Sequence, residues 1–160
     1  MALYMKIDGV VGDVTEAKHK GWIELNSSNW GMKRNIRSAV GNAKNRESAS
    51  AGCKEFTFKK PIDSSSPRLV SLAFTGQAQP TVQIDVTRVN QGGEAVVRSI
   101  ELKNAILSSF DNPLSSLQPP MEVGSFNFTQ ITISDFGTDE KGLTGTPKRT
   151  TYDLGQAKTL

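Results

Sequence analysis

The chain has 160 residues, a mass of 17.3 kDa and a formal net charge of +3, which fits one domain with a core of its own. Its 36% hydrophobic and 22% charged residues exclude a disordered chain, and the small net charge is weak support for a nucleic-acid partner. A single cysteine, Cys53, and a single histidine, His19, exclude an intrachain disulfide and a Cys/His metal cluster.

The N-terminal residues lack the basic region and apolar run of a cleaved signal peptide, because the charged Asp8 comes too early. No stretch approaches the ~20 consecutive apolar residues that span a bilayer. We therefore expect synthesis in the cytoplasm, no insertion into membranes, and export without a cleaved signal if the protein leaves the cell.

The dominant pattern along the chain is an alternation of apolar and polar residues, which predicts β-strands. Val82, Ile84 and Val86 are typical, since they share one parity within a single run. In the last long run the apolar parity changes between Phe128 and Ile131, which predicts a β-bulge. In chain order, strands are expected over residues 3–11, 21–25, 54–59, 81–87, 95–110 and 123–136.

One segment, residues 64–76, carries the signals of a helix instead. A serine can cap its first amides, Pro67 suits its first turn and Gly76 suits its exit. Leu69 and Leu72 are three residues apart, so one face of the helix is expected to pack on a sheet.

These elements predict a mainly β fold, an antiparallel β-barrel or sandwich with one short α-helix, in a single domain over residues 1–160. The residues predicted to form the core are Phe56, Phe58, Leu69, Leu72, Val82, Ile84, Val86, Ile100, Leu102, Phe126 and Ile133.

Two segments have no clear period. Residues 32–52 form a long loop rich in Ser, Ala, Asn, Arg and Gly, and a loop of this length in a small domain is usually functional or ordered by a partner. Residues 137–160 form a polar C-terminal extension, in which only residues 151–154 suggest a further strand.

The charges are distributed unevenly along the chain. Residues 25–46 contain five bases and no acid, whereas residues 104–140 contain five acids and no base. Both segments could be solvated faces, or the basic segment of one subunit could meet the acidic segment of the next. The bases are Lys33, Arg34, Arg37, Lys44 and Arg46, and the acids are Asp111, Glu122, Asp135, Asp139 and Glu140.

Catalytic chemistry is missing from the sequence. An acyl-transfer site needs a nucleophile, a base and an orienting acid, and no motif of that kind or of a phosphate or metal site is found. His19 lies in a polar stretch and is expected to be a solvent-exposed loop residue. Cys53 is expected to be a small buried or half-buried residue that opens an aromatic strand. We therefore predict no enzymatic activity, no metal and no cofactor.

A nucleic-acid-binding β-barrel is an alternative of another class. Phe56 and Phe58 lie on one strand near the basic loop and could form a platform on which bases stack. Two phenylalanines on one strand face are more often part of a core, and the acidic segment of residues 104–140 also disfavours a nucleic-acid partner.

Several short segments resemble the haemolysin co-regulated protein (Hcp) family of bacterial type VI secretion. The likeness extends over nearly the whole chain in the same order. The segments are Met-Lys-Ile-Asp-Gly-Val-Val-Gly at residues 5–12, Asn-Trp-Gly at 29–31, Phe-Thr-Phe-Lys-Lys-Pro-Ile-Asp at 56–63, Ser-Pro-Arg-Leu at 66–69, Phe-Asn-Phe-Thr-Gln-Ile at 126–131 and Tyr-Asp-Leu at 152–154.

The resemblance implies a β-barrel of the phage tail-tube type with one helix and no catalytic residues. It also implies that six subunits form a ring and that rings stack into a hollow tube inside a contractile sheath. The tube would be ejected with its tip spike, and it could hold small effector proteins in its lumen. Alternatives of similar fold are a phage-derived tail-tube protein and a monomeric adaptor of the spike tip.

In the family, the long loop after the tryptophan–glycine pair reaches onto neighbouring subunits. Here that loop is residues 32–52, which also hold the basic run. We therefore expect a subunit interface formed by basic residues of the loop and acidic residues of the neighbour. The candidate residues are Trp30, Lys33, Arg34, Arg37, Lys44, Arg46, Asp135, Asp139 and Glu140.

Overall fold

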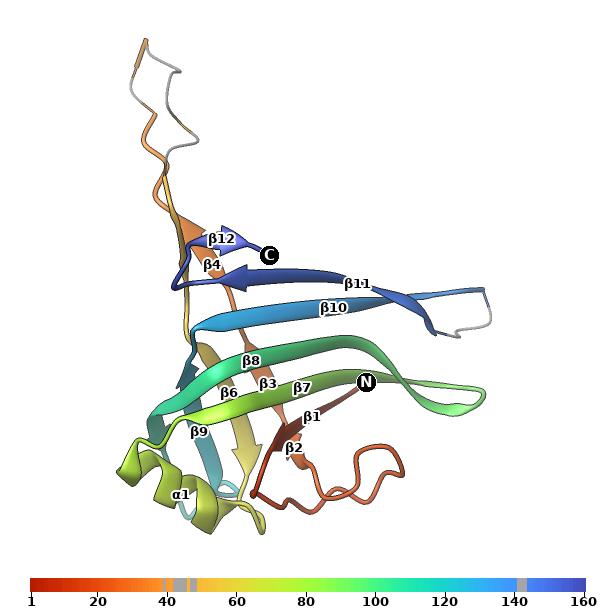
Figure 1. Ribbon diagram of the computed structural model, residues 1–160. Coiled ribbons are helices and arrows are strands. Elements are labelled where there is room, and N and C mark those ends of the chain that lie inside the picture. The colour runs from red at the N-terminus through yellow and green to blue at the C-terminus, as the bar shows by residue number, and fades with distance from the viewer. Residues whose placement is uncertain (39, 42–45, 47–48, 141–143) are drawn as a thin grey trace.

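The computed structural model describes residues 1–38, 40–41, 46, 49–140 and 144–160 (Figure 1). Strands dominate the described residues, and α1 (Ser66–Thr75) is their one α-helix, as predicted. The strands are β1 (Ala2–Ile7), β2 (Ile23–Leu25), β3 (Ser27–Asn29), β4 (Met32–Arg34), β5 (Ala51–Cys53), β6 (Phe56–Pro61), β7 (Gln79–Asn90), β8 (Gly93–Asp111), β9 (Met121–Asn127), β10 (Gln130–Thr138), β11 (Thr144–Asp153) and β12 (Lys158–Thr159).

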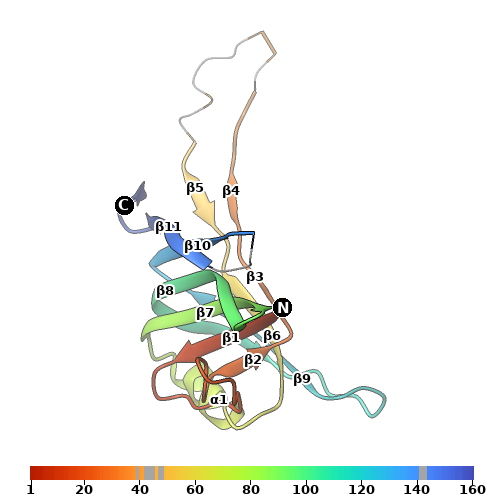
Figure 2. The same ribbon diagram turned by 90° about the vertical axis from the view of Figure 1, so that its right-hand side faces the viewer.

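The antiparallel strands close into a barrel from which a smaller sheet extends. On one edge, β8 pairs with β7, which pairs with β1, which pairs with β2. The chain continues from β2 into β3, which pairs with β6. β6 pairs with β9, and β9 pairs with the C-terminal part of β8 on the edge opposite β7. On that same edge, the middle part of β8 pairs with β10, and β11 and β12 follow β10 beyond the barrel (Figures 1 and 2). The predicted fold class, mainly β and antiparallel, is confirmed.

The prediction of one bulged strand over residues 123–136 is wrong. The segment forms two strands, β9 and β10, which pair with successive parts of β8. Opposite the break, Asn104 of β8 has a φ of 51°. Because β8 bends there, its alternation also changes, and Ala105 and Leu107 are buried while Ile106 is exposed. The parity change in the sequence therefore marks a corner between two sheets.

The core fills the barrel largely as predicted. Val86 and Ile133 are only half-buried, Val86 because the register of β7 against β8 shifts just after it, and Ile133 because it lies on the extension. Phe58 stacks on Phe126, with ring centroids 5.5 Å apart, and a Cβ at Gly124 would collide with the Phe58 ring. The predicted residues that are buried are Phe56, Phe58, Leu69, Leu72, Val82, Ile84, Ile100, Leu102 and Phe126.

The helix α1 begins and ends close to the predicted positions. Pro67 lies in its first turn, and Gly76, with a φ of 63°, ends it while its N–H donates to the Leu72 carbonyl at 3.0 Å. The expected serine cap is absent, because the Ser65 hydroxyl donates to the Asp63 carboxylate instead of accepting from a helix amide. Leu69 and Leu72 face the barrel, which α1 contacts along β8.

A buried lysine fastens the start of α1 to the barrel. Lys60 continues the parity of Phe56 and Phe58 on β6 and is fully buried. Its ammonium lies 2.5 Å from the carboxylate of Glu122, its cross-strand partner on β9, and 2.9 Å from that of Asp63 before the helix. It also donates to the Ser66 hydroxyl at 3.2 Å. Two carboxylates and a hydroxyl thus compensate the loss of hydration of the ammonium.

The two segments that lack a period contain paired strands. β4 pairs with β5, so the ends of the expected loop 32–52 form a two-stranded ribbon that projects from the barrel (Figure 2). In the expected extension 137–160, residues 144–153 form β11, which pairs with β10. Cys53 ends β5 and does not open the aromatic strand, which begins at Phe56. In the described residues, α1 is too short and too polar to cross a membrane.

We predict that Phe126→Ala lowers the free energy of unfolding by about 3–5 kcal/mol, because the ring is fully buried and its removal leaves a cavity. Phe74→Ala is the matched control, since the Phe74 side chain is exposed, and should change stability by less than ~0.5 kcal/mol. Urea denaturation of both variants at one protein concentration measures the difference. Equal losses would contradict the placement of β9 in the core.

Candidate assembly surface and histidine network

The segment of residues 31–53 is here called the arm, and its described parts include the ribbon formed by β4 and β5. The ribbon projects away from the barrel (Figure 2). Lys33, Arg34, Arg37 and Arg46 are all exposed, whereas Lys44 lies outside the described residues. Trp30, just before the arm, is half-buried and packs against the barrel core, so it anchors the arm at its root.

The arm also exposes apolar side chains. Met32 and Ile36 are 55% and 50% exposed, and Val40 is fully exposed. An isolated two-stranded ribbon is only marginally stable in water. Apolar side chains on such a ribbon are typical of a surface that another protein chain covers.

An apolar groove of about 230 Å³ lies at the root of the arm, between the arm and the extended sheet. Burial raises the pKa of the Cys53 thiol in its wall, so the thiol is protonated at neutral pH. Cys53 is half-buried, within the range predicted for it. The groove is lined by Trp30, Met32, Arg34, Ala51, Cys53, Ile131, Ile133, Thr150, Tyr152 and Thr159.

The acidic residues predicted for the interface lie on β10 and just after its end, away from the groove. Asp135 on β10 accepts two hydrogen bonds from Arg98 on β8, from Nε at 2.5 Å and from Nη2 at 3.0 Å. These bonds lower the pKa of Asp135. Asp139 and Glu140 are exposed near the turn between β10 and β11, at the end of β10 that points away from the arm (Figure 1). One chain therefore does not bring its basic and acidic segments together.

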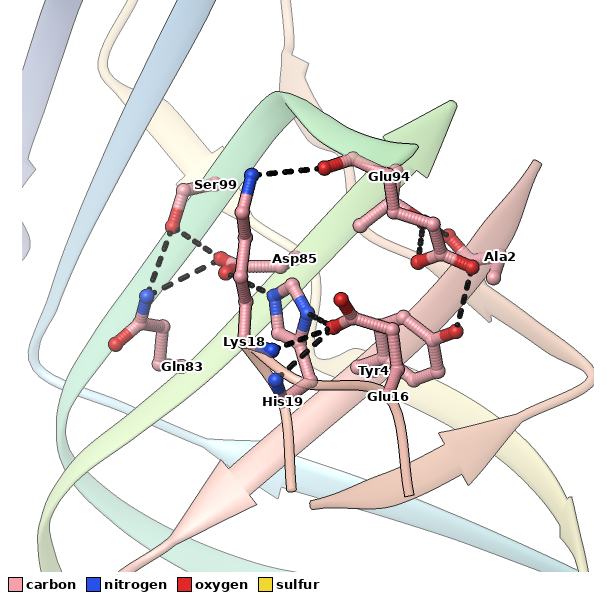
Figure 3. A network of polar contacts seen from close by, with 10 residues as sticks. Ala2, Tyr4, Glu16, Lys18, His19, Gln83, Asp85, Glu94 and Ser99 are labelled. Atoms are coloured by element: carbon pink, nitrogen blue, oxygen red, sulfur yellow. Dashed lines mark hydrogen bonds and ion pairs between the residues drawn. The ribbon is translucent and has the colours of Figure 1, made fainter. Parts of the chain in front are cut away.

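His19 is not the exposed loop residue that the sequence suggests. Only 2% of it is exposed, because the loop between β1 and β2 folds back over the outer face of the barrel (Figure 3). The imidazole stacks on Tyr4 of β1 with centroids 4.8 Å apart and meets Trp22 edge-on at 4.7 Å. The barrel wall thus has a second, smaller buried layer outside its main core.

Both ring nitrogens of His19 face carboxylates. Nδ1 lies 2.6 Å from Glu16 Oε2, and Nε2 lies 3.0 Å from Asp85 Oδ2. Asp85 is itself buried on β7 and accepts hydrogen bonds from Ser99 Oγ at 2.6 Å and Gln83 Nε2 at 3.1 Å. The hydrogen bond from His19 is the main cause that lowers the pKa of Glu16. The network joins a loop to a strand; neither nitrogen faces a hydroxyl or thiol that it could activate as a nucleophile.

Glu94 on β8 completes the network (Figure 3). Its carboxylate accepts hydrogen bonds from the Tyr4 hydroxyl at 3.0 Å and the Thr87 hydroxyl at 2.9 Å. The ammonium of Lys18 donates to the main-chain carbonyl of Glu94 at 2.9 Å. Burial, followed by the hydrogen bond to Glu94 and nearby negative charges, raises the pKa of Tyr4 to about 12. The network therefore has a negative potential.

The sequence contained a partial signal for this network. Glu16 and His19 are three residues apart, and Asp85 and Thr87 share the parity opposite to Val82 and Ile84 on β7. Polar residues opposite an apolar parity ordinarily face water in an antiparallel sheet. The covering loop buries them, and no local pattern predicts where a loop will fold.

A model of the family described as "Type VI secretion system effector, Hcp" matches residues 4–134. The chain belongs to the Hcp family. The match covers the barrel and the arm and ends before Asp135, Asp139 and Glu140. The family resemblance expected from the sequence is confirmed, and Hcp proteins are tube proteins of type VI secretion, a structural family and not one known for catalysis.

Solved structures of Hcp proteins share the fold. A structure described as a type six secretion system protein is 23% identical and superposes with a TM-score of 0.92, with 99% of each chain covered. Hcp1 from Salmonella typhimurium is 19% identical with a TM-score of 0.78, over 99% of this chain and 98% of that one. A type VI secretion system effector from Yersinia pestis is 23% identical with a TM-score of 0.72, over 94% and 98%. No curated protein matches the chain.

We predict that His19→Ala destabilises this Hcp chain by about 3 kcal/mol, because the buried Asp85 carboxylate loses the imidazole and keeps only its neutral donors Ser99 and Gln83. Cys53→Ser should cost less than ~1 kcal/mol, since Cys53 is only half-buried. Thermal unfolding monitored by circular dichroism measures both variants. A His19→Ala variant as stable as the parent would mean that the loop is not docked in solution.

Proposed function

We propose that six copies of this tube protein form a closed ring and that rings stack into the hollow tube of a type VI secretion machine. The observation that carries the proposal is the arm, which projects from a complete barrel with exposed basic and apolar side chains. A barrel that is already closed has no need of this ribbon for its own core. The arm is therefore suited to contact with another subunit.

Ring closure requires that two different surfaces of one subunit meet on neighbouring copies. The arm and the residues Asp139 and Glu140 just after β10 are such surfaces, because β4 and β5 lie near the other end of β10 and the two surfaces carry opposite charge. In the proposed contact, Lys33, Arg34 and Arg37 of one copy meet Asp139 or Glu140 of the next. Asp135 can take part in this contact only if a base of the neighbouring arm replaces Arg98, its partner within the chain. The remaining members of the proposed interface are Trp30, Lys44 and Arg46.

The other partners follow from the same proposal. The assembled tube would lie inside a contractile sheath, carry a tip spike and hold small effector proteins in its lumen. Contraction would export the tube, so the subunit would leave the cell without a cleaved signal. A phage-derived tail tube would share the ring, and the family match favours type VI secretion over it.

The nucleic-acid-binding alternative loses its structural basis. Phe56 is completely buried and Phe58 is 2% exposed, so neither ring can stack on a base. The two phenylalanines belong to the barrel core, where Phe58 packs on Phe126.

We predict a particle mass of six times 17.3 kDa for the purified chain at micromolar concentration and moderate salt. Size-exclusion chromatography with light scattering measures the mass directly. A mass of 17.3 kDa across that concentration range would refute the ring and favour a monomeric adaptor of the same fold.

We predict that reversing Arg34 and Arg37 to Glu weakens ring formation or stacking while the barrel stays folded. Exposed ion pairs contribute only ~0–1 kcal/mol each, but a contact repeated at every junction adds its losses. High salt should weaken the assembly of the parent chain in the same way. Arg68→Glu with Arg88→Glu is the matched control, since both side chains are exposed outside the arm and the net charge changes equally.

Sedimentation velocity follows the assembly of both double variants, and circular dichroism confirms their fold. If the arm variant assembled like the parent at low salt, the basic run would be a solvated face. If the control lost assembly to the same degree, net charge and not the arm would be responsible.

A further inference from the structure

The histidine network carries more negative charge than its own cations balance. Three carboxylates, those of Glu16, Asp85 and Glu94, surround or adjoin a single imidazole. The ammonium of Lys18 is engaged with the main-chain carbonyl of Glu94. Even if His19 carries a proton on both nitrogens and the Lys18 ammonium is counted, the three carboxylates leave one negative charge unbalanced. Partly buried negative charge of this kind favours a bound cation.

Three donor atoms of the network lie near one another, and small movements of the two glutamate side chains would bring all three within bonding distance of one ion. A carboxylate oxygen of Glu16, a ring nitrogen of His19 and a carboxylate oxygen of Glu94 all lie within 4.8 Å of one another. Glu16 and His19 come from the loop that covers the barrel, and Glu94 comes from β8. An imidazole nitrogen with carboxylate oxygens is a ligand set that suits zinc and similar transition metals.

The surroundings of these donors are already arranged as metal sites require. His19 Nε2 faces the buried carboxylate of Asp85, which accepts a hydrogen bond from Nε2–H and leaves Nδ1 to the ion. Ser99 and Gln83 hold Asp85 in turn. The hydroxyls of Tyr4 and Thr87 orient the Glu94 carboxylate. A chain of carboxylate, imidazole and metal is the usual outer arrangement of a protein zinc site.

We propose that one divalent transition-metal ion of the zinc class binds between Glu16, His19 Nδ1 and Glu94. The ion takes the place of the hydrogen between His19 Nδ1 and Glu16, while Nε2 keeps its hydrogen bond toward Asp85. Water fills the remaining coordination position. The bound ion would fasten the covering loop to β8 at a place distinct from the arm.

The test uses the full chain without an affinity tag, treated with a chelator and then dialysed. Isothermal titration with ZnCl₂ at neutral pH should give one ion per chain. Glu16→Gln and Glu94→Gln should each weaken binding at least ~10-fold. Glu24→Gln is the matched control, because Glu24 is an exposed acid on β2 near the same network, and should bind zinc like the parent. MgCl₂ should give no binding, since Mg²⁺ prefers oxygen ligands alone.

His19 is the only histidine of the chain, so a single imidazole reports on the site. Long-range proton–nitrogen NMR spectra should show that zinc removes the Nδ1 proton and leaves the Nε2 proton. Circular dichroism of each variant confirms that lost binding is not lost folding.

Three results would overturn the site: no zinc binding by the parent chain, equal binding by parent and Glu94→Gln, or an Nδ1 proton that persists at saturating zinc. Light scattering of the same samples keeps this outcome separate from the proposed ring, since a chain can form the ring without binding zinc.

Discussion

The bend in β8 is the constraint on which most of this structure depends. β8 pairs with β7 on one edge and with β10 and then β9 on the other, so one strand belongs to the barrel wall and to the extended sheet. At Asn104 the strand turns and its buried parity changes. This single corner closes the barrel through β9 and β6 and frees β10 and β11 to extend toward the arm. A straight β8 would leave the arm without the sheet that forms its groove.

Buried polar side chains at two places hold segments that strand pairing does not fix, namely the start of α1 and the loop between β1 and β2. Lys60 joins β6 to Glu122 of β9 and to Asp63 at the start of α1. His19 joins the loop after β1 to Asp85 of β7. Burying a charge is costly unless it is paired, so each of these groups defines one arrangement of its neighbours. The pairs favour a single position of the helix and of the loop over many positions of similar energy.

The arm and the barrel differ in how much of their apolar surface they bury within one chain. The barrel buries its apolar residues within one chain and is complete. The arm has two short paired strands, exposed bases and exposed apolar side chains, and its own contacts provide little stability. In the proposed ring, contact with a neighbouring subunit would stabilise the arm, and the barrel would hold the arm in position for that contact. In that ring, the barrel is the part that is stable alone and the arm is the part that binds a neighbouring subunit.

The sequence by itself determined the fold class, most of the core and the helix. Alternation located Phe56, Phe58, Ile84 and Phe126, and Pro67 and Gly76 marked the helix ends, because these signals act between near neighbours in the chain. It also contained the family motifs and the basic run of the arm. Only the tertiary structure decided that His19 and Lys60 are buried, that Asp135 is paired with Arg98, and that residues 123–136 form two strands. Each of these depends on a partner from another part of the fold, and no local pattern specifies which distant strand or loop will supply it.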